Sequence, residues 1–482
     1  MAETTDRTDI DRLVAEVDSS PEGPHVGAFF DFDGTLIDGY SAVMYFRERL
    51  RTRDVGLGEL LRTAIESVNV ERRGHDVTQL MSIGVGALEG WSVERLEEFG
   101  DRLFRTRVAG MVYPDARVLI EAHRRRGHTV VLASSATSFQ TRAAALDLGI
   151  DHVLCTEVHI EDGLLTGLVD GPILWGENKA AAVRDFAEDE GIDLDASFAY
   201  GNGSEDVPYL ETVGNARPLN PDEGLTRAAG ERGWPVARLR KASRHSPENL
   251  VRTLAAYSGI GAGVVAGAAL GIVTRDRATG LEVAAAVASG LALGAAGVSL
   301  EVVGDENLWA ARPAVFVFNH QSQLDVVILA SLLRADFTAV AKKELARDPL
   351  FAPMGWLADV AYVDRDNSVA AREALEPAVE ALRGGRSLVI APEGTRSSTP
   401  QLLPFKKGAF HLAMQAKVPM VPIVIRNAGE VLPAHSVFIG KGTVQVAVLP
   451  PVATGRWRPT TVDAHVDSVR QLFLDTLAHW PS

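Results

Sequence analysis

Short apolar runs that end in polar residues recur along the chain. Residues 26–30 and 129–133 form two such runs in the first half, and residues 314–318 and 387–390 repeat the pattern in the second half. Apolar runs of four or five residues, followed at once by a polar loop, are typical of buried parallel strands. The segments between them have helical periodicity. The pattern therefore predicts two α/β units in succession.

Two long uncharged stretches separate the predicted units. Residues 253–274 contain no charged side chain, and neither do residues 283–300. Twenty-two helical residues extend about 33 Å, which is enough to reach across the core of a bilayer. Both stretches are rich in Ala, Gly and Val, and because Ala and Gly are only weakly hydrophobic, membrane insertion would be marginal. Residues 250–304 are therefore expected to form either a membrane-associated helical hairpin or a hairpin buried between soluble domains, and the first is favoured.

Basic residues flank the first uncharged stretch. Residues 238–244 hold four cations, which suit an anionic membrane surface or form a solvated linker. Arg275 and Arg277 lie in the turn of the hairpin and disfavour full translocation. Residues 1–20 carry charges throughout, unlike a signal peptide. We expect a shallow hairpin that dips into the bilayer, with the protein at the cytoplasmic face of the cell membrane.

Composition and charge refine this organisation. The length of 482 residues suggests roughly three domains, and 46% apolar with 23% charged residues is ordinary for globular proteins. The net charge of −15 argues against general nucleic-acid binding. Residues 1–250 carry −16 and residues 251–482 carry +1, so the halves differ in character. A single cysteine, Cys155, excludes an internal disulfide and a Cys-based zinc cluster and fits a reducing compartment.

Two carboxylates follow the first predicted strand directly. Asp31 and Asp33 begin the sequence DFDGT, at the end of a strand where open α/β sheets place their ligands. This DxDGT motif resembles that of the haloacid dehalogenase-like phosphohydrolases. The resemblance implies a Rossmann-like domain, here over residues 24–240. It also implies that Asp31 is the nucleophile of an aspartyl-phosphate mechanism and that Asp33 is the general acid and base.

Further motifs of the same family follow in order. Ser134 directly follows the predicted strand 129–133. Lys179 is the only lysine in the first 240 residues. The resemblance implies that both bind the phosphoryl group, Lys179 as a compact point charge. Residues 40–112 are largely helical in pattern, which is similar to the helical cap of the phosphoserine phosphatase-like subgroup. Arginines 47, 49, 51 and 53 in this cap either grip an anionic substrate or form a solvated face, and the solvated face is favoured.

The last phosphatase motif departs from the family. The resemblance implies a Mg²⁺ site formed by Asp31, the Asp33 carbonyl and the loop containing Asn202 and Asp206. The family has a carboxylate where this chain has Asn202, and a neutral amide is a weaker ligand for Mg²⁺. Either Glu205 or Asp206 compensates, or metal affinity falls. The first half is thus either a Mg²⁺-dependent phosphomonoesterase for phosphoserine or a lipid phosphate, or a weak or inactive ligand-sensing module.

The second half carries a histidine and an aspartate in an HxxxxD pattern. His320 and Asp325 follow the strand 314–318 and precede an apolar helix over 326–333. Asp325 can hold the imidazole in one tautomer, so that His320 deprotonates an alcohol. The pair alone is weak, because chance produces about one such spacing in a chain with this composition.

A second motif makes the His320–Asp325 pair more specific. Residues 391–397 contain PEGTR, and HxxxxD with PEGTR resembles the glycerolipid acyltransferases of the lysophosphatidate type, here over residues 305–482. Segments 342–345, 404–408 and 418–423 support the resemblance. It implies transfer of an acyl group from acyl-CoA or an acyl carrier protein to 1-acyl-sn-glycerol 3-phosphate, giving phosphatidate.

The same resemblance implies where the acceptor phosphate binds. Arg396 supplies a bidentate guanidinium, and the other residues of this site are Glu393, Gly394 and Thr395. Arg365 and Lys407 are second candidates, each either a phosphate ligand or a surface charge. The complete prediction is a bifunctional membrane-associated enzyme: a capped Rossmann-like phosphatase domain, a helical hairpin and an α/β acyltransferase domain.

Overall fold

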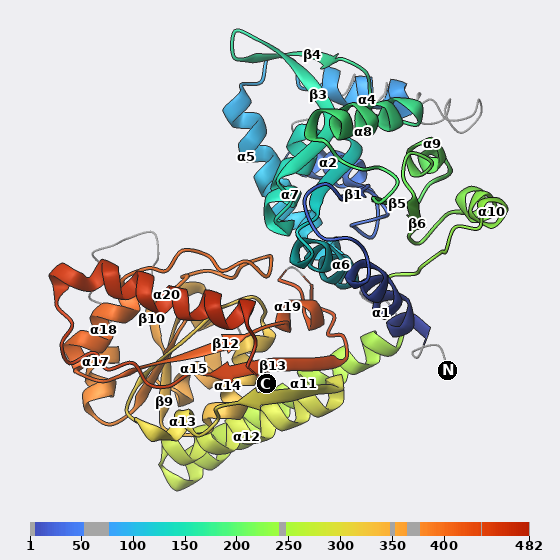
Figure 1. Ribbon diagram of the computed structural model, residues 1–482. Helices are drawn as coiled ribbons and strands as arrows, with labels where there is room; N and C mark the ends of the chain where they lie inside the picture. Colours follow the sequence, from blue (N-terminus) through green and yellow to red (C-terminus); the bar gives the residue numbers. More distant parts are fainter. Residues whose placement is uncertain are drawn as a thin grey trace. The chain divides into compact units, whose positions relative to one another are not determined.

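The computed structural model describes residues 5–52, 77–240, 247–347, 352–363, 376–434 and 436–481. The chain divides into two compact units, Met1–Ala242 and Ser243–Ser482 (Figure 1). Each unit has its own sheet with helices on both faces. The prediction of two α/β domains in succession is confirmed.

The first unit is built on a six-stranded sheet with β1 near its centre. Its order is β4 (Leu164–Asp170), β3 (His152–Glu161), β2 (Thr129–Thr137), β1 (Gly27–Phe30), β5 (Phe198–Gly201) and β6 (Asn215–Pro218). All neighbours are parallel except β3 and β4. Both predicted strands of this half are present, and β1 pairs with β2. The ends of β1, β2 and β5 therefore lie together at one edge.

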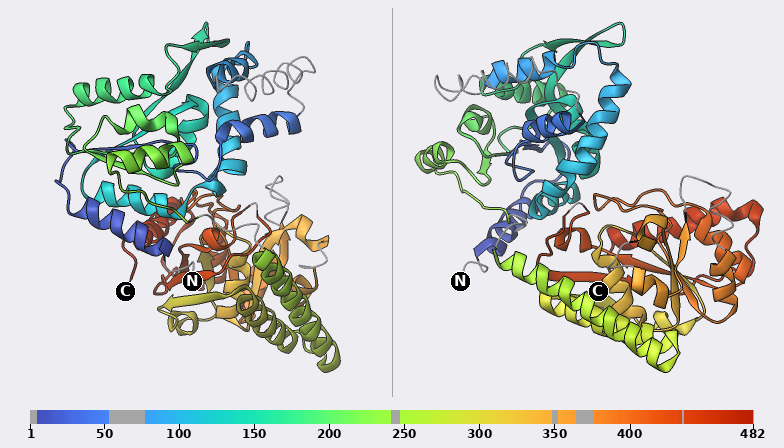
Figure 2. Two further views of the ribbon diagram at one scale, coloured as in Figure 1. Left: turned by 90° about the vertical axis from the view of Figure 1, so that its right-hand side faces the viewer. Right: turned by 180° about the vertical axis from the view of Figure 1, so that it is seen from behind.

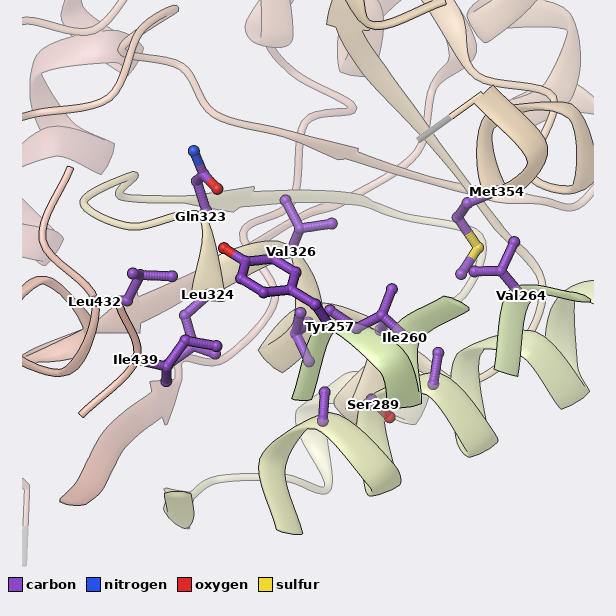
Figure 3. Close-up of a pocket in the computed structure, with 14 residues that line it drawn as sticks. Tyr257, Ile260, Val264, Ser289, Gln323, Leu324, Val326, Met354, Leu432 and Ile439 are labelled. Atoms are coloured by element: carbon purple, nitrogen blue, oxygen red, sulfur yellow. The ribbon is translucent and has the colours of Figure 1, made fainter. Parts of the chain in front are cut away.

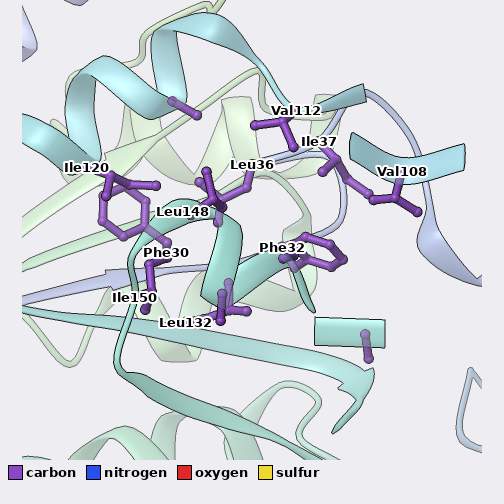
Figure 4. Packing of buried hydrophobic residues seen from close by; sticks show 14 of the residues in the cluster. Phe30, Phe32, Leu36, Ile37, Val108, Val112, Ile120, Leu132, Leu148 and Ile150 are labelled. Atoms are coloured by element: carbon purple, nitrogen blue, oxygen red, sulfur yellow. The ribbon is translucent and has the colours of Figure 1, made fainter. Parts of the chain in front are cut away.

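Both faces of this sheet are covered by helices. Ala28 and Phe30 of β1 face one core, and Phe29 faces the other, as the two-residue period of a strand requires. The first face is covered by α1 (Thr5–Asp18), α6 (Pro114–Arg125) and α7 (Ser138–Leu148). The second is covered by α8 (Glu177–Glu190), α9 (Val207–Leu210) and α10 (Glu223–Arg232). Figure 4 shows Ile120 and Leu148 of the first set packed near Phe30.

Helices follow β1 where a cap was expected. They are α2 (Ser41–Thr52), α4 (Val77–Gly86) and α5 (Val93–Leu103), then short turns at Phe104–Val108 and Ala109–Met111. Arg47 is exposed, but Arg49 is buried and donates to the Tyr45 hydroxyl and the Ala87 carbonyl. The solvated face is therefore wrong for Arg49, whose charge is used inside the cap. The side chains of Arg51 and Arg53 lie outside the described residues.

The second unit contains a seven-stranded sheet. Its order is β10 (Ala361–Val363), β9 (Phe337–Lys342), β11 (Ser387–Ile390), β8 (Val315–Phe318), β12 (Met420–Ile425), β13 (Gly442–Val448) and β7 (Val298–Val303). Neighbours are parallel except for β12 and β13. One face packs on α17 (Glu376–Arg383), α18 (Gly408–Ala416) and α20 (Val462–Ala478), and the other on α14 (Leu324–Leu333) and the helical hairpin.

The hairpin consists of α11 (Pro247–Thr274) and α12 (Arg277–Ala296), which lie side by side (Figures 1 and 2). Glycines allow the contact to be close: a Cβ on Gly263 would lie 2.3 Å from the Ala288 nitrogen. The hairpin was expected to cover residues 250–304, but α12 ends at Ala296. Gly297 takes a left-handed conformation at φ 69° and ends the helix, and the chain continues as β7.

The two faces of the hairpin have different surroundings. α12 buries a row of small residues, among them Ala284 and Ala292, in the core of the second unit. The outer side of α11 exposes Leu254, Val265 and Val273. Both helices are long and apolar enough to cross a membrane by length and composition, although core helices pass the same test. The hairpin is thus packed into the second unit on one side and apolar and exposed on the other.

Candidate active sites

The first candidate site lies at the end of β1. Asp31 directly follows this strand and is buried, and its amide donates to the Tyr200 carbonyl of β5 at 2.9 Å. Lys179, in the first turn of α8, places Nζ 2.7 Å from Asp31 Oδ1 and 2.7 Å from Asp206 Oδ1. Three residues far apart in the sequence therefore converge, as the motif order predicts.

Burial and charge act against each other in this cluster. Burial raises the pKa of Asp31 to about 7, although the ammonium of Lys179 opposes the change. Burial alone would lower the pKa of Lys179, but the charges of Asp206 and Asp31 raise it above its usual value. The lysine therefore stays cationic and holds the Asp31 carboxylate in place.

Asp33 is held by a serine that the sequence did not single out. Ser41, the first residue of α2, donates its backbone N–H to Asp33 Oδ1 at 2.6 Å and its hydroxyl to Oδ2 at 3.0 Å. Gln140 Nε2 donates to the same hydroxyl at 3.1 Å. Burial raises the pKa of Asp33 to about 6. A carboxyl group with that pKa can both give and take a proton near neutral pH.

Ser134 lies on the neighbouring strand at the same edge of the sheet. It is buried, two residues beyond the β2 partner of Phe30, and its Oγ accepts the Ala136 N–H at 3.1 Å. Its hydroxyl thus remains able to donate.

The loop after β5 supplies oxygen atoms of two kinds. Asn202 Oδ1 accepts from the Thr35 hydroxyl at 3.2 Å. Asp206 Oδ2 accepts the N–H groups of Asn202 and Gly203, at 3.1 and 3.3 Å, while Oδ1 contacts Lys179. Both oxygens of Asp206 are therefore occupied by protein donors, which gives this carboxylate a positioning role in the loop.

These donors are suitable for Mg²⁺. Among the described residues, no group of three or more His, Cys, Asp or Glu is arranged to hold a metal. Mg²⁺ needs fewer protein ligands, because it takes one or two carboxylates together with substrate phosphate and water. The Asp31 carboxylate, the Asp33 carbonyl and the Asn202 amide oxygen are all hard donors and fit this requirement.

The second candidate site follows β8. His320 Nδ1 lies 2.8 Å from Asp325 Oδ2, which also accepts the N–H groups of Gln321 and Ser322 at 2.8 and 2.9 Å. Asp325 is fully buried, whereas 20% of the His320 side chain is exposed. Nδ1 is engaged by the carboxylate, so Nε2 is the nitrogen left for proton transfer.

The PEGTR loop is tied to the histidine loop. Glu393 Oε1 accepts the His320 N–H at 2.7 Å, and Oε2 accepts the Leu403 N–H at 2.9 Å. Ser397 N–H donates to the His320 carbonyl at 2.7 Å. Burial raises the pKa of Glu393 to about 7. Glu393 thus joins two loops, and its carboxylate is not turned toward a ligand.

The remaining predicted phosphate ligands lie in different surroundings. Arg396 is half-buried near Asp325, and burial lowers its pKa. Thr395 is exposed, and Gly394 is at φ 72°. Lys407 pairs with the exposed Asp463 at 2.6 Å. Arg365 lies outside the described residues.

An apolar cavity of about 90 Å³ lies beside the HxxxxD loop (Figure 3). Gln323 and Leu324, which stand between His320 and Asp325 in the sequence, line it. The other walls come mainly from α11, α12 and α14, including Tyr257, Val264 and Val326. The hairpin therefore contributes to a cavity that begins at the candidate catalytic loop.

Comparison with known proteins separates the two halves in the same way. Residues 28–211 match the family described as haloacid dehalogenase-like hydrolase. The chain is 32% identical to the inhibition of morphological differentiation protein of Streptomyces azureus, over 49% of this chain and 84% of that protein. It is 35% identical to a phosphoserine phosphatase of Mycobacterium tuberculosis, over 45% of this chain and 72% of that protein.

The second half matches a different family. Residues 299–426 match the family described as Acyltransferase. The chain is 38% identical to the 1-acyl-sn-glycerol-3-phosphate acyltransferase of Saccharomyces cerevisiae, over 38% of this chain and 60% of that protein.

Proposed function

Because the chain belongs to the haloacid dehalogenase-like hydrolases in its first half and carries an acyltransferase domain in its second, we propose two linked activities. The second half acylates 1-acyl-sn-glycerol 3-phosphate to phosphatidate. The first half hydrolyses a phosphomonoester, either phosphoserine or a lipid phosphate, with Mg²⁺.

The acyltransferase proposal is carried by the His320–Asp325 pair. Asp325 fixes His320 through Nδ1 at 2.8 Å, so that Nε2 can take the proton of the acceptor hydroxyl. The alkoxide oxygen then attacks the thioester carbonyl of acyl-CoA or an acyl carrier protein. The thiolate leaves and receives the proton from the imidazolium. The acceptor oxygen attacks directly, so no protein nucleophile is needed.

Two further features favour a lipid acceptor. The apolar cavity beside the HxxxxD loop suits part of an acyl chain, and Val264 and Ala288 of the hairpin line it. The outer side of α11 exposes Leu254, Val265 and Val273. An exposed apolar face next to a lipid site suits attachment to the cytoplasmic face of a membrane.

The phosphatase proposal rests on the buried Asp31–Lys179–Asp206 cluster. Asp31 attacks phosphorus and forms an aspartyl-phosphate, Asp33 protonates the leaving oxygen, and Lys179 with Ser134 neutralises and orients the phosphoryl oxygens. Asp33 then activates water to release phosphate. When Mg²⁺ is bound by Asp31, the Asp33 carbonyl and Asn202, it supplies a Lewis acid that offsets phosphate charge.

Acyl transfer is tested with purified full-length protein, lysophosphatidate and acyl-CoA. His320→Ala should reduce acylation by about 10²–10⁴-fold, since that is the usual contribution of a general base. Phosphate release by the same variant should be unchanged. Acylation that persists in His320→Ala would show that another group is the base.

Phosphate release is tested on a panel of phosphoserine, lysophosphatidate and phosphatidate. Asp31→Asn should abolish Mg²⁺-dependent release and leave acyl transfer unchanged. Asn202 favours a second candidate, a ligand-sensing module, because its amide replaces a charged metal ligand. No release from any phosphomonoester, with or without Mg²⁺, would select that candidate. Phosphate release by Asn202→Asp that reaches half its maximum at a lower Mg²⁺ concentration than in the parent protein would support the enzyme.

A further inference from the structure

Two adjacent lysines follow the PEGTR loop, and their side chains have different surroundings. Lys407 pairs with Asp463 at 2.6 Å, and both side chains are exposed. Lys406 is also exposed, but its side chain lies over the PEGTR loop: a Cβ built on Gly394 would be 2.9 Å from Lys406 Nζ and 3.0 Å from its Cδ and Cε. The sequence prediction named Lys407, and not Lys406, as a candidate phosphate ligand.

The backbone fixes Lys406 in this position. Its N–H donates to the Pro392 carbonyl at 2.8 Å, and the neighbouring Leu403 N–H donates to Glu393 Oε2 at 2.9 Å. Glu393 also binds the His320 N–H. One set of hydrogen bonds therefore positions the catalytic histidine, the PEGTR loop and the segment of Lys406 together.

Two cations of this region have no carboxylate partner among the described residues. Neither Arg396 nor Lys406 makes an ion pair or a side-chain hydrogen bond there, whereas Lys407 does. Arg396 is half-buried near Asp325. Cations without an ion pair, in loops that are hydrogen-bonded to the loop of the general base, are suited to a dianionic phosphate, with arginine as a fork and lysine as a point charge.

We propose that Lys406, and not Lys407, binds the phosphate of the acceptor together with Arg396. The assignment rests on the proposed acyltransferase function. Gly394 has a second role in it, because any side chain at this position would occupy the space of the Lys406 ammonium. The alternative ligand of Lys406 is a phosphate group of the donor, acyl-CoA.

Steady-state kinetics of Lys406→Ala and Lys407→Ala test the proposal with matched variants. Lys406→Ala should raise the KM for lysophosphatidate by about tenfold or more, as the loss of one charged contact predicts. The KM for acyl-CoA should stay within about twofold, and 1-acylglycerol, which lacks phosphate, should be used equally well by both variants. Lys406→Arg should recover part of the loss. Lys407→Ala should match the parent protein.

Three outcomes would overturn the proposal. A raised KM for acyl-CoA in Lys406→Ala would assign the lysine to the donor. Equal effects of the two alanine variants would remove its distinction from Lys407. No change in either constant would remove Lys406 from the site.

Calorimetric titration with sn-glycerol 3-phosphate separates this proposal from the acyltransferase function. Binding should weaken about tenfold in Lys406→Ala and remain unchanged in Lys407→Ala, whether or not acylation is detected. Lys406-dependent binding without any acylation would retain the phosphate site and reject the proposed activity. Binding that is equal in both variants would reject the phosphate site.

Discussion

Buried histidines in the first unit form a hydrogen-bonded chain. His123 Nε2 lies 2.8 Å from the Tyr200 hydroxyl, and His123 Nδ1 lies 2.8 Å from His128 Nδ1. His128 Nε2 lies 2.8 Å from the Pro21 carbonyl. The carbonyl can only accept, so His128 donates to it, His123 donates to His128, and Tyr200 donates to His123. All three hydrogen bonds form when both imidazoles are neutral. Protonation of either ring would remove an acceptor nitrogen and break one of these hydrogen bonds.

Stability of the first unit should therefore depend on pH. Burial lowers the pKa of both histidines, most strongly that of His123. Their contribution is complete above pH 6.5 and is lost as pH falls through the native pKa values. For each proton that the chain takes up on unfolding, the free energy of unfolding should fall by about 1.4 kcal/mol per pH unit below pH 6.5. Calorimetric melting between pH 5 and 8 measures this slope.

His123→Gln supplies the comparison for the pH slope. The variant should be less stable at pH 8 but should lose less stability on acidification than the parent protein. The exposed His479 of the second unit gives a control, since His479→Gln should leave this slope unchanged. An identical slope in His123→Gln would contradict the prediction.

At the residue scale, the sequence motifs identified the candidate catalytic residues but not the residues that hold them in place. The spacing of DxDGT and HxxxxD led to Asp31, Asp33, His320 and Asp325, which the fold brings to two strand ends. The support from Ser41 could not be predicted, because a serine at a helix start usually caps its own helix.

At the scale of elements, the contact between α11 and α12 depends on glycine spacing. A Cβ on Gly263 would meet the backbone of Ala288 at 2.3 Å, and one on Gly267 would meet the Gly280 carbonyl at 2.4 Å. Gly261 lies on the same helix with nothing within 4 Å of its Cβ position. The uncharged stretches predicted two helices. They did not show where the second helix ends: in the structure it ends at Ala296, and the chain continues as β7, which pairs with β13.

Alanine at two nearby glycines should therefore have opposite effects. Gly263→Ala should destabilise the second unit by about 1–3 kcal/mol, because the helices must separate. Gly261→Ala should stabilise it by about 0.5–1 kcal/mol through the helix propensity of alanine. Urea unfolding of the two variants measures both values. Equal effects would mean that the helices are not held at this distance.

At the scale of the whole molecule, charge is divided between the units. Residues 1–250 carry −16 and residues 251–482 carry +1. The apolar strands and the motif order were enough to predict two α/β domains. The surroundings of the hairpin were not predictable, because Ala- and Gly-rich helices suit both a protein core and a membrane.

Membrane binding should reflect this division. Residues 243–482 alone should bind anionic vesicles at least as tightly as the full chain, since the acidic half is repelled by anionic lipid. The difference should shrink as salt increases from 0.05 to about 0.5 M, where the Debye length falls below about 5 Å. Co-sedimentation measures both. No vesicle binding by either protein would reject the membrane-facing role of α11.

Lys179 has a consequence for chemical labelling. It is the only lysine side chain within residues 1–240, and it is buried between two carboxylates, whereas Lys406, Lys407 and Lys441 are exposed. An amine-reactive fluorophore should mark the exposed lysines of the folded second unit and spare Lys179. Delayed incorporation at Lys179 would then time the opening of the phosphatase site, without a mutation or a substrate.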